Sequence, residues 1–380
     1  MDIKEARNKI DEIDEKLTEL FKERMAASLE VAKYKKENNL PVFVPARERE
    51  ILNKVTLCAG KELESYVKAL YLSLFDISRT YQKQQICEKS DLIKKIEKVV
   101  TASPANIPNR ASVACQGVEG AYSQHACEKL FEFPTISYYK SFEGVFKAVE
   151  SGECRYGILP VENSTAGSVT AVYDLMNKYH FYITAGVKLF IEHKLLCPKG
   201  TVLNDVKEIF SHEQAINQCS QFLSTLSGVK ITPMRNTAAA AEAVSKCKRS
   251  DVAAIGSADC AELYGLQVIE TEGLRNTDNN YTRFICISKN LEIYPGACKT
   301  SIILSLPHKA GALYNTMSRF ACLGLNLTKI ESRPIPGSNF EFKFYFDIDS
   351  SVYNKSLLTA LTLLEDECDE FTYLGSYTEK

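Results

Sequence analysis

Neither sign of charge dominates this sequence, and long apolar runs are missing from it. Its 46 lysines and arginines nearly balance 48 aspartates and glutamates, and the net charge of −2 leaves no basic surplus for a polyanion. Nucleic acid is therefore not expected as a partner. No apolar run reaches the roughly 18 residues that a membrane span needs, and the charged start at residues 1–5 does not fit a signal peptide. The composition predicts a globular, cytoplasmic protein without membrane contact.

Patterns for metal binding and for disulfides are also missing. The 13 cysteines include no Cys-x-x-Cys pair, and the five histidines are dispersed without metal-ligand spacing. This scatter favours reduced, buried thiols over disulfides or zinc. No feature demands a metal or an organic cofactor, so none is expected. The length of 380 residues predicts two or three domains, each with its own core.

The first hundred residues predict helices. Residues 2–38 contain no proline or glycine, and a helix of this length would extend roughly 55 Å, more than one small domain covers. Further helices are predicted at about 46–58 and 62–86, the last continuing through 92–100, before a linker at 101–109. The long helix carries two apolar rows at heptad spacing, so its seam is expected to need a second protomer. The rows are Ile3, Ile10, Leu17 and Val31, and Ala6, Ile13, Leu20, Ala27 and Tyr34.

Cations interrupt this apolar seam. Arg24 occupies a position where the heptad asks for an apolar residue, and Arg7 and Lys35 lie on the flank of the same face. An unpaired charge there would cost several kcal/mol. The pattern therefore indicates either an anionic ligand or a salt bridge between protomers, to Asp14 or Glu30.

Residues 3–85 resemble the all-helical chorismate mutase family. The resemblance covers nearly the whole helical module, and it departs from the family at Val44, where members often have an acidic residue. It rests on four ordered groups: Ala6-Arg7-x-x-Ile10-Asp11-x-Ile13-Asp14; Arg24 followed by Val31-Ala32-x-x-Lys35; Pro41-Val42 leading to Arg47-Glu48-Arg49-Glu50; and Ser78-x-x-x-Gln82.

The resemblance implies a site that rearranges chorismate to prephenate. A pericyclic rearrangement needs no nucleophile or proton transfer, only a reactive conformer held in place and a stabilised negative charge on the ether oxygen. The implied carboxylate contacts are Arg24, Arg47, Ser78 and, from a second protomer, Arg7. Lys35 and Gln82 are the implied donors to the ether oxygen, and Glu48 is implied to hold the ring hydroxyl.

Residues 110–293 alternate short apolar runs with helical stretches, as in an α/β sheet. Polar clusters adjoin these runs, and ligand groups collect at strand ends in open α/β sheets. The loop 117–123 has N–H groups that could receive a carboxylate, or it is a plain strand-to-helix turn. The cluster 162–168 exceeds what one helix cap requires, but a capping loop stays open as an alternative. The predicted strands are 111–115, 156–160, 206–210, 252–255 and 284–287.

Together these clusters closely resemble the prephenate dehydratase family. The resemblance implies two subdomains like those of type II periplasmic binding proteins, with the site in the cleft between them. The implied site residues are Asn163, Ser211, Gln218, Thr282 and Arg283, with Glu162 and Ser164 as neighbours. The matching segments are 117–123, 142–149, 157–164, 211–219, 237–241, 253–256 and 280–284.

The reaction of that family expels carbon dioxide and water from prephenate, and aromatisation of the ring drives it. Thr282 would donate a hydrogen bond to the departing oxygen, because a threonine hydroxyl is too weak an acid to protonate it completely at an early stage. Arg283 would either grip a substrate carboxylate with two hydrogen bonds or pair with a structural acid.

Residues 299–380 predict a compact α+β module in the order βαββαβ, the ferredoxin-like arrangement. Segments 307–313 and 326–334 resemble those of the phenylalanine-sensing ACT domain. The resemblance implies an effector pocket between paired domains, formed by Gly311, Ala312, Leu313, Glu331, Ser332, Arg333 and Pro334. The predicted elements are strand 300–306, helix 311–323, strand 326–333, a turn at 334–337, strand 340–348, helix 352–365 and strand 370–375.

The sequence therefore predicts a multidomain enzyme with a helical chorismate mutase domain (1–100), an α/β prephenate dehydratase domain (110–293) and an α+β ACT regulatory domain (299–380). It would make phenylpyruvate from chorismate through prephenate, under feedback by L-phenylalanine, as a homodimer or a higher homo-oligomer. Two alternatives stay open. One is an arogenate dehydratase, whose substrate differs only at the side chain. The other is an amino-acid-binding regulator with degenerate catalytic modules, against which the retained Lys35, Gln82 and Thr282 argue.

Overall fold

The computed structural model describes residues 2–38, 40, 44–86, 90–309, 311–335 and 341–380. The motif Pro41-Val42, Ala310, the second half of the predicted turn at 334–337 and the start of the predicted strand 340–348 lie outside the described residues. The chain folds as two compact units: Met1–Lys98 with Ile303–Phe371, and Val99–Ile302 with Thr372–Lys380. The limits of the three predicted domains stay a prediction.

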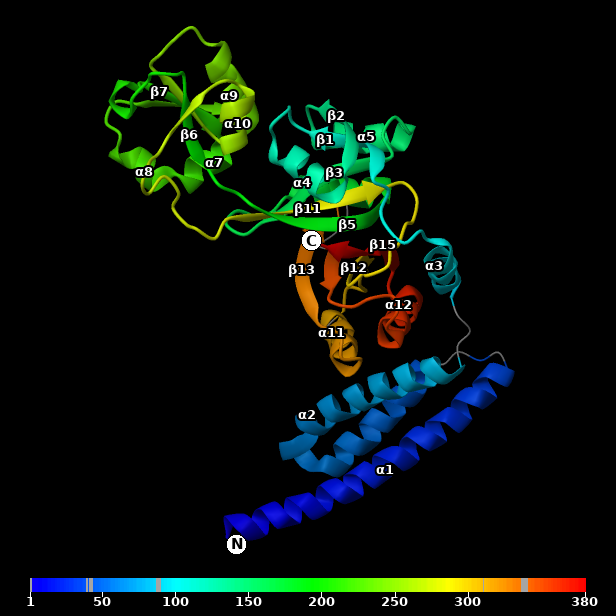
Figure 1. Cartoon of the computed structure of the whole chain (residues 1–380). Coiled ribbons are helices and arrows are strands. Elements are labelled where there is room, and N and C mark those ends of the chain that lie inside the picture. Colours follow the sequence, from blue (N-terminus) through cyan, green and yellow to red (C-terminus); the bar gives the residue numbers. More distant parts are fainter. Residues whose placement is uncertain (1, 39, 41–43, 87–89, 310, 336–340) are drawn as a thin grey trace. The chain divides into compact units, whose positions relative to one another are not determined.

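The first unit begins with two long helical elements (Figure 1). Helix α1 spans Ile3–Glu37 and α2 spans Pro45–Ile86. Gly60 inside α2 has φ 72° and ψ 165°, outside the helical region, so α2 consists of two helices as predicted. The large apolar residues of the two rows on α1 are exposed in the single chain, with Ile10 at 56% and Leu20 at 61%. The described residues of this chain therefore leave the seam of α1 uncovered.

A separate helix follows where the sequence predicted a continuation. Helix α3 spans Asp91–Ala102, and Ser90 before it is not helical. The Ser90 hydroxyl accepts a hydrogen bond from the Ile93 N–H at 3.3 Å, which satisfies one of the free donors at a helix start. The predicted continuation is wrong, because this cap begins a new helix.

The C-terminal part of the chain has the predicted β-α-β-β-α-β order of elements. Within the first unit the strands lie in the order β13-β14-β12, and β13 is antiparallel to β14. Strands β12 and β15 each continue from one unit into the other. The elements are β12 Lys299–Ser305, α11 Ala312–Cys322, β13 Leu327–Pro334, β14 Phe342–Ile348, α12 Lys355–Glu367 and β15 Glu370–Glu379.

The second unit consists of two lobes, each built on a mixed sheet. In the first lobe the strand order is β15-β5-β11-β3-β1-β2, with β1 parallel to β2 and β3, and β11 antiparallel to β3 and β5. Alternate apolar residues of β1, β3, β5 and β11 pack with α4 in its core. The elements are β1 Arg110–Gln116, α4 Tyr122–Leu130, β2 Phe133–Tyr139, α5 Phe142–Ser151, β3 Tyr156–Asn163, β4 Gly167–Ser168, α6 Thr170–Tyr179, β5 Tyr182–Phe190 and β11 Tyr281–Ser288.

The second lobe is an excursion between β5 and β11. Its strand order is β10-β6-β9-β7-β8, and Figure 1 shows two crossing segments joining it to the first lobe. These are residues 191–193 and 270–280, and the Ile191 N–H donates to the Asn280 carbonyl at 2.7 Å. The elements are β6 Lys194–Cys197, η1 Leu203–Asp205, β7 Glu208–His212, α7 Glu213–Gln218, α8 Ser220–Thr225, β8 Lys230–Met234, α9 Thr237–Lys246, β9 Val252–Gly256, α10 Ala258–Leu263 and β10 Gln267–Ile269. Each of the five predicted strands overlaps one of these two sheets.

The pairing of β3 with β11 places Asn163 directly opposite Thr282. The register shifts between Arg283, which faces Glu162, and Phe284, which faces Pro160. One residue of β3 is thus skipped, and such a bulge changes the direction of nearby side chains. The strand ends that carry the predicted polar clusters are therefore fixed relative to each other.

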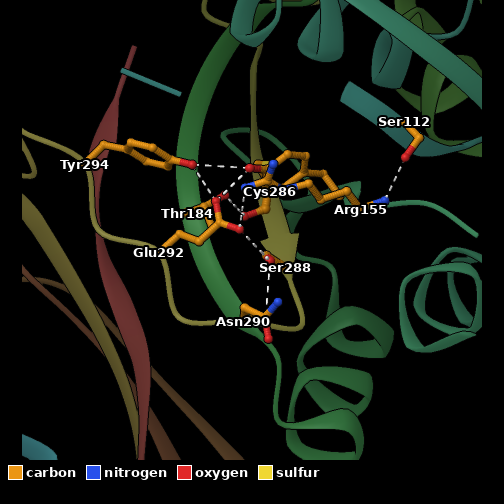
Figure 2. A network of polar contacts seen from close by, with 9 residues as sticks. Ser112, Arg155, Thr184, Cys286, Ser288, Asn290, Glu292 and Tyr294 are labelled. Carbon is orange, nitrogen blue, oxygen red and sulfur yellow. Dashed lines mark hydrogen bonds and ion pairs between the residues drawn. The ribbon is translucent and has the colours of Figure 1, made fainter. Parts of the chain in front are cut away.

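A buried polar network holds the opposite ends of the same two strands (Figure 2). The Glu292 carboxylate accepts hydrogen bonds from the hydroxyls of Tyr156 (2.6 Å) and Tyr294 (2.5 Å) and from Arg155 Nη2 (3.1 Å). Burial, together with the hydrogen bonds to Glu292, raises the pKa of both tyrosines, so both hydroxyls remain donors. Ser288 at the end of β11 also donates to Glu292, at 3.4 Å. The network therefore fixes the register of β3 against β11 at the ends of these strands that lie away from Asn163 and Thr282.

The twelve cysteines that the structure describes are all free thiols. Most of them are buried in the second unit. Burial raises the pKa of the Cys219 thiol, for example, to about 12. In the described part of the chain, every helix is too short or too polar to cross a lipid bilayer.

Candidate active sites

A cleft lies between the two lobes of the second unit. Its cavity has a volume of about 400 Å³, within the range that holds a small organic ligand. One wall comes from β3, β11 and the start of α4, and the other comes from α7 and the start of α9. Polar side chains of both lobes line the cavity, among them Asn163, Thr282, Tyr122, Gln218, Arg235 and Thr237.

Asn163, at the end of β3, has a fixed amide orientation. Its Oδ1 accepts hydrogen bonds from the Thr165 N–H (3.0 Å), the Thr165 hydroxyl (2.6 Å) and the Ala166 N–H (2.9 Å). Because donors hold the oxygen, the amide nitrogen points toward β11 and donates to the Thr282 hydroxyl oxygen at 2.9 Å. Thr282 thus accepts one hydrogen bond and keeps its own proton for a partner in the cleft.

Gln218 extends this cluster into the second lobe. From the end of α7, its Nε2 donates to the Thr165 hydroxyl at 2.6 Å and to Asn163 Oδ1 at 3.3 Å. Asn280 donates from Nδ2 to Gln218 Oε1 at 3.0 Å and accepts at Oδ1 from Asn163 Nδ2 at 2.9 Å. The structure therefore connects the predicted residues Gln218, Asn163 and Thr282 in one hydrogen-bonded chain, in which Gln218 contacts Asn163 and Asn163 contacts Thr282.

Ser211 lies outside this cluster, and its predicted role in the site stays a prediction. The side chain is completely buried in β7, and its hydroxyl donates to the Ile255 carbonyl at 2.8 Å. Successive residues of a strand point to opposite faces, and the neighbouring His212 is the one that lines the cleft. Ser211 therefore connects strands of the second sheet.

Arg283 faces away from the cleft. Thr282 and Phe284 line the cavity, so the residue between them on β11 points to the other face of the sheet. Its Nε donates to the Glu379 carboxylate at 2.6 Å and its Nη2 donates to the Tyr377 hydroxyl at 2.7 Å. Of the two alternatives that the sequence left open, the structure has the pairing with a structural acid.

The Glu379 carboxylate forms ion pairs with three cations. Besides Arg283 it binds the ammonium groups of Lys299 (2.9 Å) and Lys188 (2.8 Å). Burial by itself would raise the pKa of Glu379, but the hydrogen bonds from both lysines and the charge of Arg283 outweigh it and lower the pKa to about 2. The C-terminal strand β15 is thereby tied to the strand that carries Thr282.

Replacing Glu379 by glutamine is expected to lower the free energy of unfolding by about 3 kcal/mol at pH 7, because it leaves buried cations without their counter-charge. The folded-state pKa of Glu379, about 2, lies below the ordinary value of 4.5. The stabilisation is therefore complete above about pH 4.5 and is lost as the pH falls toward 2. Urea unfolding followed by circular dichroism between pH 7 and pH 3 measures this.

The matched control is Glu270→Gln, whose carboxylate is 82% exposed beside Lys194 and should change the free energy of unfolding by less than about 0.5 kcal/mol. A Glu379→Gln protein as stable as the wild type at pH 7 would refute the coupling. So would a stability difference that stays constant on acidification.

In the helical module, Arg24 of α1 lies against α2 with an incomplete set of partners. Its guanidinium carbon is 5.8 Å from the centre of the Phe75 ring. Its Nη1 is buried and has no hydrogen-bond partner among the residues that the structure describes. Burial lowers the pKa of Arg24, while Tyr71 and Glu48 act in the opposite direction. A buried donor of this kind is a costly feature unless an anion binds it.

Three more predicted residues of this module are buried or half-buried on α1 and α2. Ser78 and Gln82 are buried one turn apart on α2, with Gln82 Nε2 3.5 Å from the Ser78 hydroxyl oxygen. Lys35 is half-buried, and burial lowers its pKa while the Glu48 carboxylate opposes the shift. Because Glu48 acts on both Arg24 and Lys35, these residues share one electrostatic site.

Arg7 and Arg47 are not brought to this site by the described residues of a single chain. Both are exposed, and Arg47 Nη1 pairs with Glu50 at 2.8 Å on the surface. Arg79, which the sequence reading passed over, forms ion pairs with Glu48 and with Asp76. The roles of Arg7 and Arg47 in catalysis stay predictions.

The predicted effector residues occupy a helix start and a strand end. Gly311 has φ 84° at the N-cap of α11, a conformation that favours glycine, and Ala312 and Leu313 form the first turn. The other four predicted residues, 331–334, form the end of β13. In the strand register, Glu331 lies opposite Tyr345 of β14, and Pro334 lies opposite Phe342. A pocket between paired domains stays a prediction.

Two residues bonded to Gln218, Asn280 and His193, were not among the predicted site residues. Asn280 stands two positions before Thr282, and its place in the polar stretch was the available signal. His193 follows an apolar strand as a lone histidine, with no pattern around it that indicates a function. The structure buries both and connects both to Gln218.

Comparisons with known proteins agree with this geometry. The profile of the Prephenate dehydratase family matches residues 113–292, and that of Chorismate mutase type II matches residues 6–83. The bifunctional chorismate mutase/prephenate dehydratase of Escherichia coli (strain K12) is 33% identical over 380 residues, covering 98% of this chain and 95% of the relative. This chain belongs to the bifunctional chorismate mutase/prephenate dehydratase family. It is therefore an enzyme rather than a purely regulatory protein.

Two further relatives cover the dehydratase part of this bifunctional enzyme. Arogenate dehydratase/prephenate dehydratase 2 of Arabidopsis thaliana is 34% identical over 313 residues, covering 79% of this chain and 81% of the relative. A prephenate dehydratase of Arthrobacter aurescens, solved in complex with L-Phe, is 28% identical with a TM-score of 0.64, covering 70% of this chain and 89% of that one. The helical mutase domain and the α/β dehydratase domain with mixed sheets thus match known members of the family.

Proposed function

We propose that the helical module rearranges chorismate to prephenate and that the cleft of the second unit converts prephenate to phenylpyruvate. The observation that carries the second step is the directed hydrogen bond from Asn163 Nδ2 to Thr282 Oγ1 at the cavity wall. The first step rests on the incompletely paired Arg24, on the Glu48 carboxylate that acts on both Arg24 and Lys35, and on the buried pair Ser78 and Gln82.

In the cleft, Thr282 acts as a hydrogen-bond donor. The amide of Asn163 cannot accept a proton through its nitrogen, so it does not turn the hydroxyl into a nucleophile. It directs the hydroxyl proton toward the cavity, where the departing oxygen of prephenate develops negative charge. The electron pair of the C–CO2⁻ bond then enters the ring, carbon dioxide and hydroxide leave, and the product ring is aromatic.

In the helical module, catalysis is positioning and electrostatics. Arg24 holds a carboxylate of chorismate, while Lys35 and Gln82 donate to the ether oxygen as its bond breaks. Glu48, kept in place by Arg79, accepts a hydrogen bond from the ring hydroxyl. No proton moves between the protein and the substrate.

A second copy of the chain completes the mutase site. The apolar rows of α1 are exposed along the whole helix, and α2 adds exposed Leu57, Tyr66 and Leu70. A contiguous apolar surface of this kind marks a protein interface, and the hydrophobic effect favours covering it with the same surface of a partner. The partner also supplies Arg7, so the functional form is a homodimer or a higher homo-oligomer.

The C-terminal module is an ACT domain that binds L-phenylalanine. Gly311 allows a ligand to approach the start of α11, where a carboxylate meets the positive end of the helix. The dehydratase of Arthrobacter aurescens, solved with L-Phe, supports an effector of this kind. Binding shifts the dimer toward a cleft geometry that is poor for prephenate.

Purified protein given chorismate, prephenate and arogenate separately tests these proposals. Phenylpyruvate is expected from chorismate and from prephenate, and excess L-phenylalanine is expected to lower its formation. Phenylalanine formed from arogenate faster than phenylpyruvate from prephenate would make the chain an arogenate dehydratase. Equal rates with and without phenylalanine would remove the effector proposal, and a chain inactive on all three substrates would refute both catalytic assignments.

A further inference from the structure

Each of the two segments that cross between the lobes has one polar side chain that is hydrogen-bonded to the side-chain amide of Gln218. His193 ends the first crossing segment, between β5 and β6, and Asn280 ends the second, before β11. Gln218 Oε1 lies between them, 2.8 Å from His193 Nε2 and 3.0 Å from Asn280 Nδ2. The amide of Gln218 is thus held where the two lobes join.

The direction of these hydrogen bonds fixes the tautomer of His193. Gln218 Nε2 donates to Thr165 and Asn163, so its other amide atom is the oxygen and accepts. The Nε2 of His193 must then carry the hydrogen, which leaves Nδ1 as an acceptor. Nδ1 is buried and without a partner among the described residues, and the ring is 3% exposed and lines the cleft.

The surroundings keep this imidazole neutral. Burial lowers the pKa of His193, the hydrogen bond to Gln218 opposes this, and the nearby charge of Arg275 lowers the pKa further. The ring therefore offers one donor to Gln218 and adds no positive charge to the cleft.

We propose that His193 is a positioning residue of the dehydratase site, acting on Thr282 through Gln218 and Asn163. Its Nε2–H fixes the amide of Gln218, which helps to hold Asn163 Oδ1 and so directs Asn163 Nδ2 to the Thr282 hydroxyl. Without this donor the Gln218 amide can rotate, and the polar contacts between the second lobe and the catalytic strands become weaker. This inference rests on the proposed dehydratase function.

A pair of amide substitutions separates this role from simple packing. Glutamine carries its amide nitrogen about as far from the backbone as Nε2 of histidine does, whereas asparagine carries it about as far as Nδ1. His193→Asn is expected to lower kcat for prephenate by about 10- to 100-fold with KM changed by less than about threefold, the loss of one buried hydrogen bond. His193→Gln is expected to stay within about fivefold of wild type, because it restores the donor.

Chorismate turnover by the same variants is the internal control, and it should equal that of the wild type. A double variant, His193→Asn with Gln218→Leu, is expected to be no slower than Gln218→Leu by more than about threefold, because both act through one amide. In the wild-type protein, the ¹⁵N spectrum of His193 should show a neutral ring protonated at Nε2, a measurement that does not depend on the folding of any variant.

Each outcome decides a different question. A wild-type chain without prephenate turnover overturns the dehydratase proposal itself. With an active wild type, the role of His193 fails if His193→Asn folds and keeps full activity, if His193→Gln is as slow as His193→Asn, or if the ring is protonated at Nδ1.

Discussion

Lys35→Ala is expected to lower kcat for the rearrangement of chorismate by about 1000-fold, because it removes a charged donor from the oxygen on which negative charge develops. The charge on the ether oxygen grows only as its bond breaks, so KM should change little. Lys35 is half-buried, and the Glu48 carboxylate opposes the effect of burial on its pKa, so the ammonium group sits in the shared site with Arg24. Chorismate turnover measured by its loss of absorbance, with prephenate turnover in parallel, tests this.

The neighbouring residue provides the matched control. Lys36 is exposed on α1 one position further along the helix, about 100° around the axis, so Lys36→Ala should leave chorismate turnover unchanged. Prephenate turnover should be the same in both variants, since that reaction takes place in the other unit. Chorismate turnover by Lys35→Ala at the wild-type rate would remove the assignment of the whole helical site.

Much of the architecture followed from periodicity. The long uninterrupted helix, the break near Gly60 and the alternation of strands and helices are local patterns, and the structure confirms them. The prediction that the helix 62–86 continues through 92–100 failed because Ser90 caps a new helix. Continuing one helix and starting another at a serine are both weak local preferences, and the sequence did not decide between them. The exposed rows of α1 confirm that the predicted seam is open in one chain, while its partner stays a proposal.

The residues predicted for the dehydratase site divide between the cleft and the opposite faces of the sheets for one physical reason. Successive residues on a strand face opposite ways, so Thr282 and Arg283 could not both enter the cleft, nor could Ser211 and His212. The alternation was visible in the sequence, but the choice of face depends on contacts far along the chain. Glu379 lies 96 positions after Arg283 and holds it by an ion pair, and no local pattern near β11 indicates that partner.

The hydrogen-bonded cluster was predictable only in part for the same reason. Asn163 and Thr282 lie at strand ends, where ligand groups collect, and the structure places them opposite each other. The amide of Gln218 reaches them because the second lobe returns to the first through two crossing segments. His193 contacts Gln218 only because the second lobe folds back onto the first. A lone histidine after an apolar strand carries no functional signature in the sequence.

Thr282→Ala is expected to lower kcat for prephenate by about 100- to 1000-fold, because the departing oxygen loses the donor that polarises it. The variant keeps the cavity and its other donors, so KM should remain within about threefold. Asn163 Nδ2 would lose one acceptor but keep Asn280 Oδ1 at 2.9 Å, and the cluster should stay folded. Thr282→Ser restores the hydroxyl on a more mobile side chain and should recover activity to within about tenfold of wild type.

Thr135→Ala is the control for this pair, since Thr135 is exposed on β2 of the same sheet. Its kcat for prephenate should equal that of the wild type. Chorismate turnover should be normal in all three variants, so the chain that lacks Thr282 should accumulate prephenate from chorismate. Phenylpyruvate formed at the wild-type rate by Thr282→Ala would mean that another hydrogen-bond donor polarises the departing oxygen. Because Asn163 donates to the Thr282 hydroxyl and Gln218 donates to Asn163, that result would also remove the catalytic role proposed for these two amides.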